Sequence, residues 1–409
     1  MNSRSFPRPV EKNHPSKVPL GILCLLALMV FDGVFSSLMS SDDQDRTIIH
    51  FFRFSLSLVY LSYILFLNDF FIRRLLPLER VLTLFIPWSL FSAILISPDR
   101  FLALMEVSRY IYWTLVFSFV YAVVRRYPQT VQYICFFLAV STVYYLMETI
   151  TKRGEMIDHR GSQKVGGINA SYSLIFIYPW LLIYQRKWIK FLGMLAVCGG
   201  ILISYKRGAI LTLFIVIGMT VFSGVLIYRG KKLFNWVVTN VFFGLFLTLF
   251  GIYIFSNLGL AEGYEYRMQD IDSGRREIYE DLFNSISRSS TFEVICGHGL
   301  LSTVRETGYV AHNDWLEAFY GLGIVGLAMF TWIHFCILVL LFRLYQNKAE
   351  YFIPCFAGYT IFFCRALTGG WLHYTSFAYF LALIAIAYAS SEREYWDNFS
   401  DDGYKIRRT

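Results

Sequence analysis

Residues 312–327 read HNDWLEAFYGLGIVGL, a polar head joined directly to a long apolar run. The head carries three ionisable side chains, His312, Asp314 and Glu317. The apolar run extends over residues 314–342 and can cross a hydrocarbon core of about 30 Å. Charge at the mouth of a membrane helix is tolerated where protein or water receives it. The stretch therefore predicts a polytopic membrane fold with a site at one membrane boundary.

The composition of the whole chain points to the same class. Of its 409 residues 56% are hydrophobic and 19% aromatic, and the mean hydropathy is +0.49, far above what a soluble domain needs. We therefore expect an all-α membrane fold with about twelve spans, judged by length. The expected spans are 18–35, 48–71, 79–97, 104–124, 130–149, 169–185, 188–204, 208–228, 233–256, 314–342, 351–367 and 371–390.

The distribution of Lys and Arg predicts the orientation. Cationic loops are retained in the cytoplasm during insertion, and alternate short loops are rich in Arg and Lys. This bias puts both termini inside, as an arm over residues 1–17 and a tail over 391–409. Nine helices over 18–256 and three over 314–390 would then flank one large outer loop at 257–313.

The net charge is +8, and most of the Lys and Arg residues lie in those inner loops. We therefore expect them to contact anionic membrane lipids, and we expect no nucleic-acid partner. The seven cysteines are scattered singly, without a CxxC pair or His neighbours at ligand spacing. Neither a disulfide framework nor a metal site is indicated. Arg53 and Arg109, inside early helices, suggest a polar lumen or headgroup contact without a defined role.

The large loop is expected to contain an amphipathic helix over 272–286, because Ile278, Leu282 and Ile286 fall on one stripe. A helix N-terminus next to an arginine makes an anion site, and Arg275 stands near the predicted start. Further along, Gly297-His298-Gly299 predicts a tight turn with close backbone approach.

Three outer segments supply cations or histidine to one side of the membrane: 205–209, 272–276 and 312–317. Convergent arginines with a nearby histidine suit the binding of a phosphorylated lipid at a membrane surface. The candidate catalytic residue is His312. The candidate substrate-binding residues are Lys206, Arg207, Arg275, Arg276, Asn313, Asp314 and Glu317.

The order of Lys206-Arg207-Gly208, Ser273-Gly274-Arg275, Gly297-His298-Gly299 and His312-Asn313 with Gly323-Ile324-Val325-Gly326 resembles the O-antigen ligase and polymerase superfamily of bacterial inner-membrane glycosyltransferases. The resemblance covers roughly residues 165–330. It implies a periplasmic site and an undecaprenyl-diphosphate-linked glycan donor. It further implies a glycan or lipid A core acceptor, and a chain-length regulator is a further candidate partner. By resemblance, Arg207 and Arg275 hold the donor diphosphate and His312 is the catalytic histidine.

A lipid diphosphate is already an activated leaving group, so the hypothesis needs no metal and no cofactor, only positioning and charge stabilisation. His312 would take the proton from the attacking sugar hydroxyl, with inversion at the anomeric carbon. Asn313 or Asp314 would orient the His ring, and Glu317 would be a reserve base or a sugar-hydroxyl acceptor. The alternative readings are structural: His312 as a helix cap, Arg207 as an interfacial residue and Arg275 with Arg276 as a solvated helix start.

Three functions compete. A polymerase joins repeat units while donor and acceptor both remain on lipid diphosphate, and we favour it because residues 312–317 resemble polysaccharide polymerases more closely. A ligase moves finished glycan onto lipid A core. A transporter or flippase would place its site at mid-membrane on broken helices, often with inverted repeats, whereas here the ionisable residues cluster on one face and no repeat is found.

Overall fold

The computed structural model describes residues 17–38, 43–66, 75–158, 169–204, 206–239, 275–368 and 377–406, and within them every regular element is a helix. The predicted all-α class is confirmed for this part of the chain. The arm at 1–16, most of the ninth predicted span and the first part of the large loop, 257–274, lie outside the described residues.

The helices fall into three groups along the chain. The first group comprises α1 Leu20–Leu38, α2 Asp43–Phe66, α4 Pro77–Phe91 with a π-helical turn at Ser92–Ile96, α5 Arg100–Arg126, α6 Thr130–Asp158, α7 Ala170–Ile183, α8 Lys187–Ile203 and α9 Arg207–Ile227. Residues 230–239 are also helical. Three short helices follow, α12 Arg275–Ser287, α13 Thr291–Cys296 and α14 Ser302–Thr307. The last group is α15 Asp314–Gln346, α16 Phe352–Thr368 and α17 Phe377–Ile406.

Six of the described helices are long and apolar enough to cross a membrane: Thr47–Phe66, Pro77–Ile96, Arg100–Arg126, Thr130–Lys152, Arg207–Ile227 and Asp314–Gln346. Four shorter apolar helices accompany them, at Leu20–Ser36, Ala170–Ile183, Phe352–Thr368 and Phe377–Glu392. Large apolar side chains such as Phe51, Phe214 and Phe335 are exposed on the outside, which water disfavours and lipid does not. The chain is therefore a multi-pass membrane protein by length and composition of its helices.

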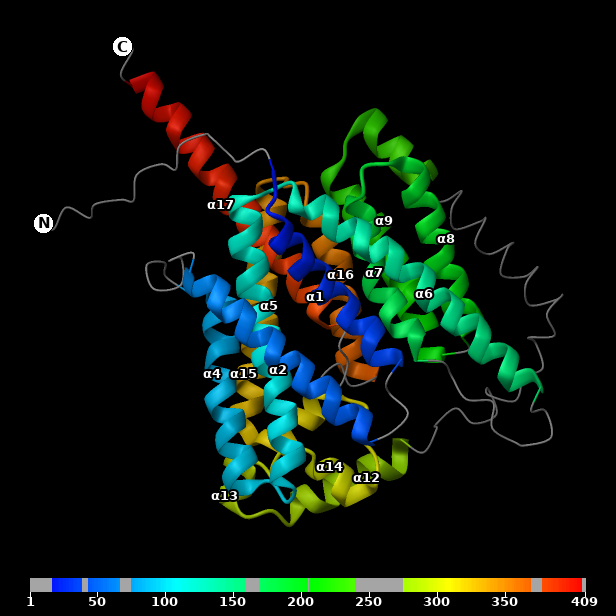
Figure 1. The fold of residues 1–409 in the computed structure, drawn as a ribbon, viewed down its shortest axis with the longest axis vertical. Coiled ribbons are helices and arrows are strands. Elements are labelled where there is room, and N and C mark those ends of the chain that lie inside the picture. The colour runs from blue at the N-terminus through cyan, green and yellow to red at the C-terminus, as the bar shows by residue number, and fades with distance from the viewer. Residues whose placement is uncertain are drawn as a thin grey trace, which may run out of the picture.

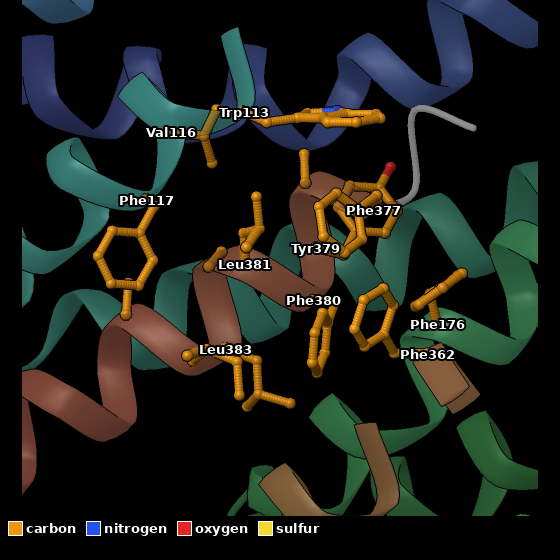
Figure 2. Close-up of a cluster of buried hydrophobic side chains, with 14 of the residues drawn as sticks. Trp113, Val116, Phe117, Phe176, Phe362, Phe377, Tyr379, Phe380, Leu381 and Leu383 are labelled. Atoms are coloured by element: carbon orange, nitrogen blue, oxygen red, sulfur yellow. The ribbon is translucent and has the colours of Figure 1, made fainter. Parts of the chain in front are cut away.

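Helix α5 is the centre of the bundle. Of its most apolar 18-residue window 83% is buried, against 33–44% for the other five candidate spans. It packs along α17 and α2, and Figure 2 shows Trp113 of α5 above Phe377 of α17, with Phe362 of α16 nearby. The Trp113 and Phe377 rings meet edge to face at 4.9 Å. Residues 377–389 of α17 are buried as well, whereas α2 and α4 bury one face and expose large apolar side chains such as Phe54 and Leu84 on the other.

The two ends of the bundle differ. Helices α12, α13 and α14 gather at one end, at the bottom of Figure 1, while the start of α1 and the last turns of α17 lie at the other. Local caps set several of the boundaries at the α12 end. Asp99 accepts from the backbone N–H of Leu102 at the start of α5, and Ser290 accepts from that of Glu293 at the start of α13.

Candidate functional site

Helix α15 is broken near its beginning. Gly323 has φ 69° and ψ −169°, a conformation that essentially only glycine adopts. Trp315 and His334 would be about 28 Å apart along a straight helix, yet their ring centres are 4.8 Å apart. Residues 314–322, here called the folded-back helix, therefore double back onto the rest of α15. The sequence predicted one helix over 314–342, and the structure divides it at Gly323.

The end of the folded-back helix is capped by distant parts of the chain. The backbone N–H groups of His298 and Gly299 donate to the carbonyls of Tyr320 and Gly321 at 2.8 and 3.0 Å. The indole N–H of Trp88 donates to the carbonyl of Leu322 at 3.1 Å. The last carbonyls of a helix have no partner within it, so these three donors satisfy groups that would otherwise be buried without one.

The predicted tight turn at residues 297–299 is confirmed, because Gly297 and Gly299 have φ 83° and 98°. A Cβ atom on Gly297 would collide with the carbonyl oxygen of Gly321. The close approach of the turn to the end of the folded-back helix therefore depends on glycine at position 297.

His298 is held by packing. Its ring stacks on Tyr320 with centres 4.4 Å apart, and its Nε2 lies 2.8 Å from the hydroxyl of Ser289. Glu293, whose Oε1 lies 3.8 Å from the other ring nitrogen, also accepts from the backbone and hydroxyl of Ser290. Those hydrogen bonds hold the pKa of Glu293 below its ordinary value. These contacts favour a structural role for His298 in this turn.

The other end of the folded-back helix carries the predicted catalytic segment. His312 has φ 53°, a left-handed conformation uncommon outside glycine, and Asn313 is the N-cap. The Asn313 side-chain oxygen accepts from the backbone N–H groups of Trp315 and Leu316 at 3.1 and 3.2 Å. Asp314 is fully buried. Asn313 thus fixes the direction in which the chain leaves His312.

Glu317 anchors the loop before His312. One carboxylate oxygen accepts from the hydroxyl of Thr303 at 2.5 Å, and the other accepts from the backbone N–H of Ala311 at 3.0 Å. Glu317 is only 9% exposed. Both oxygens are occupied, which favours a positioning role over the predicted roles as reserve base or sugar-hydroxyl acceptor.

The amphipathic helix predicted over residues 272–286 is present as α12, Arg275–Ser287, and it lies against the same segment. Ile278 and Leu282 are buried with Ala311 and Tyr320, and the Ser285 hydroxyl lies 2.9 Å from that of Tyr320. Arg275 is the first residue of α12, a helix that packs against Ala311, the residue before His312. Arg276 points outward instead, pairing with Glu280 at 2.8 Å while its side chain stays 76% exposed.

An open apolar groove runs beside Asn313. Its volume is about 440 Å³, and α12 forms one wall while α15 forms the other. The lining residues are Tyr279, Phe283, Asn313, Trp315, Leu316, Phe319 and Leu327. A groove of this character can hold part of an apolar chain next to the polar N-cap.

Lys206 and Arg207 belong to a second group, at the ends of α7, α9 and α16. Arg365 of α16 is fully buried, and its guanidinium carbon lies 3.3 Å from the centre of the Tyr172 ring in α7. The Lys206 ammonium lies 5.4 Å from the same ring centre. We call Lys206, Arg365 and Tyr172 the cation cluster, and Arg207 follows Lys206 as the first residue of α9. Sequence reasoning did not select Arg365 or Tyr172, although a lone arginine inside an apolar run was a usable signal.

A stack of rings joins the two groups. Trp315 lies on His334 at 4.8 Å between ring centres, and His334 lies on Phe362 of α16 at 4.5 Å. Phe362 precedes Arg365 by three residues, about 4.5 Å along the helix. The structure thus brings His312, Asn313, Asp314 and Glu317 together with the helix of Arg275, and sets Lys206 and Arg207 apart in a neighbouring group.

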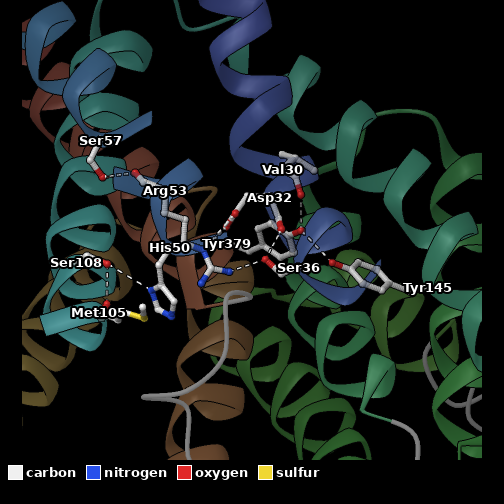
Figure 3. A network of polar contacts seen from close by, with 10 residues as sticks. All are labelled: Val30, Asp32, Ser36, His50, Arg53, Ser57, Met105, Ser108, Tyr145 and Tyr379. Carbon is white, nitrogen blue, oxygen red and sulfur yellow. Dashed lines mark hydrogen bonds and ion pairs between the residues drawn. The ribbon is translucent and has the colours of Figure 1, made fainter. Parts of the chain in front are cut away.

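Buried ion pairs account for the two unexplained arginines. Figure 3 shows Arg53 of α2 between Asp32 and Ser36 of α1. The Arg53 Nε lies 3.2 Å from both carboxylate oxygens of Asp32, and its Nη2 donates to Ser36 at 2.5 Å. Arg109 pairs with Glu106 at 2.8 Å within α5. Ionisable groups thus also lie inside the bundle, which agrees with the polar lumen that Arg53 and Arg109 suggested and adds to the cluster at one membrane face.

Among the described residues no group of three or more His, Cys, Asp or Glu side chains is placed to hold a metal ion. No protein-family model matches the chain, and no curated protein matches it in sequence.

Proposed function

We propose that this protein is a membrane glycosyltransferase that polymerises oligosaccharide repeat units carried on undecaprenyl diphosphate into a surface polysaccharide. The observation that carries the proposal is the juxtaposition at the α12 end of the bundle. His312 stands at the cap of the folded-back helix, the helix of Arg275 packs on its loop, and an apolar groove opens beside Asn313. A lipid-linked sugar combines an apolar chain with a charged head, and this juxtaposition supports binding of both.

In the proposed reaction the acceptor sugar hydroxyl attacks the anomeric carbon of the donor. Its oxygen forms the new glycosidic bond, the bond from that carbon to the diphosphate oxygen breaks, and the configuration inverts. His312 takes the hydroxyl proton, and Arg275 and Arg207 stabilise the charge that develops on the departing lipid diphosphate. No metal or cofactor takes part. Asn313 and Glu317 position His312 through their hydrogen bonds to its neighbours.

The proposed setting is the bacterial inner membrane, with both termini in the cytoplasm, about twelve spans and the α12 end facing the periplasm. The loop bias of Lys and Arg supports this orientation. The gathering of α12, α13 and α14 at one end, opposite the start of α1, is consistent with it.

The buried ion pairs favour a second candidate, because charged side chains inside membrane helices often mark transport pathways. Asp32 with Arg53 and Glu106 with Arg109 are such pairs. In a transporter or flippase these ion pairs would line the transport pathway. In a transferase they would stabilise the packing of the helices.

A deletion strain separates the candidates. If the protein is the polymerase, the surface glycan shrinks to lipid A core carrying one repeat unit. Bare core with long glycan still on undecaprenyl diphosphate would instead identify a ligase. Bare core with single lipid-linked units confined to the cytoplasmic leaflet would identify a flippase.

A further inference from the structure

A small cavity lies between α5 and the folded-back helix. Its volume is about 20 Å³. A single buried water molecule needs roughly 10–15 Å³ of such space, so the cavity has the size of one water. Its walls include Glu106 and Tyr110 of α5, Leu300 and Leu301 before α14, and Glu317 and Ala318 of the folded-back helix. Two carboxylates from distant parts of the chain therefore border one enclosed space.

Both carboxylates are buried. Glu106 and Glu317 are each 9% exposed. Ionised carboxylates repel one another and only accept hydrogen bonds, so neither can satisfy the other directly. A neutral group that donates two hydrogen bonds offsets this cost when it stands between them, and water is the smallest such group. The size of the cavity and the chemistry of its walls thus suit the same occupant.

The two carboxylates are held in place from opposite sides. Arg109 lies one turn after Glu106 in α5, and its Nη1 is 2.8 Å from Oε2 of Glu106. The two oxygens of Glu317 accept from the Thr303 hydroxyl and from the backbone N–H of Ala311. A carboxylate offers about four acceptor positions, so Glu317 can accept a further donor. Helix α5 is the most deeply buried of the candidate spans and presents Glu106 from the centre of the bundle.

We propose that this cavity holds one water molecule that donates to both Glu106 and Glu317, which makes Glu106 a positioning residue for the loop of His312. The link runs from Arg109 to Glu106, through the water to Glu317, and on to the backbone N–H of Ala311 directly before His312. The inference rests on the proposed function where it assigns this loop to the transferase reaction.

Amide hydrogen exchange tests the link without turnover. In the double variant Glu106→Leu with Arg109→Met, apolar side chains replace the whole ion pair, so no unpaired charge is buried. The peptide that contains the Ala311 amide should exchange about 2–10-fold faster, as expected for loss of one hydrogen bond. Asp32→Leu with Arg53→Met replaces a buried pair that does not border the cavity, and that peptide should exchange as in the unaltered protein. Equal exchange of the peptide in the two double variants would overturn the inference.

A positioning role also predicts the response of the transfer rate. Glu106→Leu with Arg109→Met should lower kcat and leave KM unchanged, because the loop carries the proposed base. Glu317→Ala already breaks the link, so adding the same double change to it should lower kcat little further. Factors that simply multiply in the combined variant would show that Glu106 does not act through Glu317.

A measurement on the unaltered protein covers the case in which Glu106→Leu with Arg109→Met does not fold. A high-resolution cryo-EM map should show density for one water within hydrogen-bond distance of both carboxylates. Carboxylates in direct contact, or a cavity closed by an apolar side chain, would overturn the inference.

The inference and the proposed function fail separately. A deletion strain with unchanged surface glycan would remove the polymerase proposal, while exchange at Ala311 that depends on Glu106 would still stand. Normal polymerisation by Glu106→Leu with Arg109→Met, together with unchanged exchange at Ala311, would keep the polymerase and remove the role of Glu106.

Discussion

The carboxylate of Glu317 accepts a hydrogen bond at 3.0 Å from the backbone N–H of Ala311, the residue directly before His312. The folded-back helix therefore holds the loop that carries the proposed base. The same carboxylate also accepts from the hydroxyl of Thr303 in α14. This one side chain therefore links α14, the loop before His312 and the folded-back helix.

Substitutions at Glu317 distinguish a role in positioning the His312 loop from a role in proton transfer. Glu317→Gln should keep most activity, because the amide oxygen can still accept from Ala311 while the amide N–H donates to Thr303. Glu317→Ala leaves a buried N–H without a partner, which costs about 1–3 kcal/mol, and should lower both thermal stability and transfer. Thermal unfolding in detergent and transfer rate check this. Equal inactivity of the two variants at unchanged stability would identify Glu317 as a base.

Asn313 is expected to act as the helix cap. Asn313→Ala should destabilise the protein by about 1 kcal/mol, whereas Asn313→Ser, which can cap equally well, should retain stability and activity. The measurement is the unfolding temperature of both variants together with their transfer rates. A Ser variant that is stable yet as inactive as the Ala variant would show that the amide touches substrate.

The pair of Asp32 and Arg53 should be a structural requirement. Asp32→Ala leaves a buried guanidinium without its carboxylate, a loss of about 3–5 kcal/mol, and the double change Asp32→Leu with Arg53→Met should recover much of it. Arg276→Ala, which breaks the exposed pair with Glu280, is the matched control and should cost less than about 1 kcal/mol. Similar unfolding temperatures for Asp32→Ala and Arg276→Ala would contradict the expected cost.

Gly323 should not tolerate any side chain. Its positive φ and the clash of an added Cβ with the carbonyl of Ile295 predict that Gly323→Ala prevents the folding back of residues 314–322. Gly218→Ala meets nothing within 4 Å in α9 and is the control. Size-exclusion chromatography of detergent extracts should show loss of monodisperse protein for Gly323→Ala and no loss for Gly218→Ala. Normal yield and activity of Gly323→Ala would refute this role.

Local patterns were enough to predict the helical membrane class, the amphipathic helix α12 and the turn at residues 297–299. Each depends on periodicity or on backbone freedom within a few residues. The stripe of Ile278 and Leu282 is buried as its spacing requires. The glycines of the turn have the positive φ that their residue type permits.

The features that were missed depend on partners far away in the chain. The break at Gly323 needs carbonyl caps from Trp88 and from residues 298–299, which no pattern around residue 323 reveals. Sequence reasoning did not select Arg365, because its partner Tyr172 belongs to another helix. The grouping of Lys206 with Arg365 on the Tyr172 ring, and the packing of α12 against Ala311, likewise follow from tertiary packing.

The role of His312 is tested most directly by reconstitution. Purified protein in liposomes is supplied with a lipid-diphosphate-linked repeat unit, and the length of the lipid-linked glycan is followed over time. The unaltered protein should extend the glycan, and His312→Ala, folded to the same extent, should be slower by a factor of about 10²–10⁴, the usual contribution of a general base. Extension by His312→Ala at the unaltered rate would contradict the account.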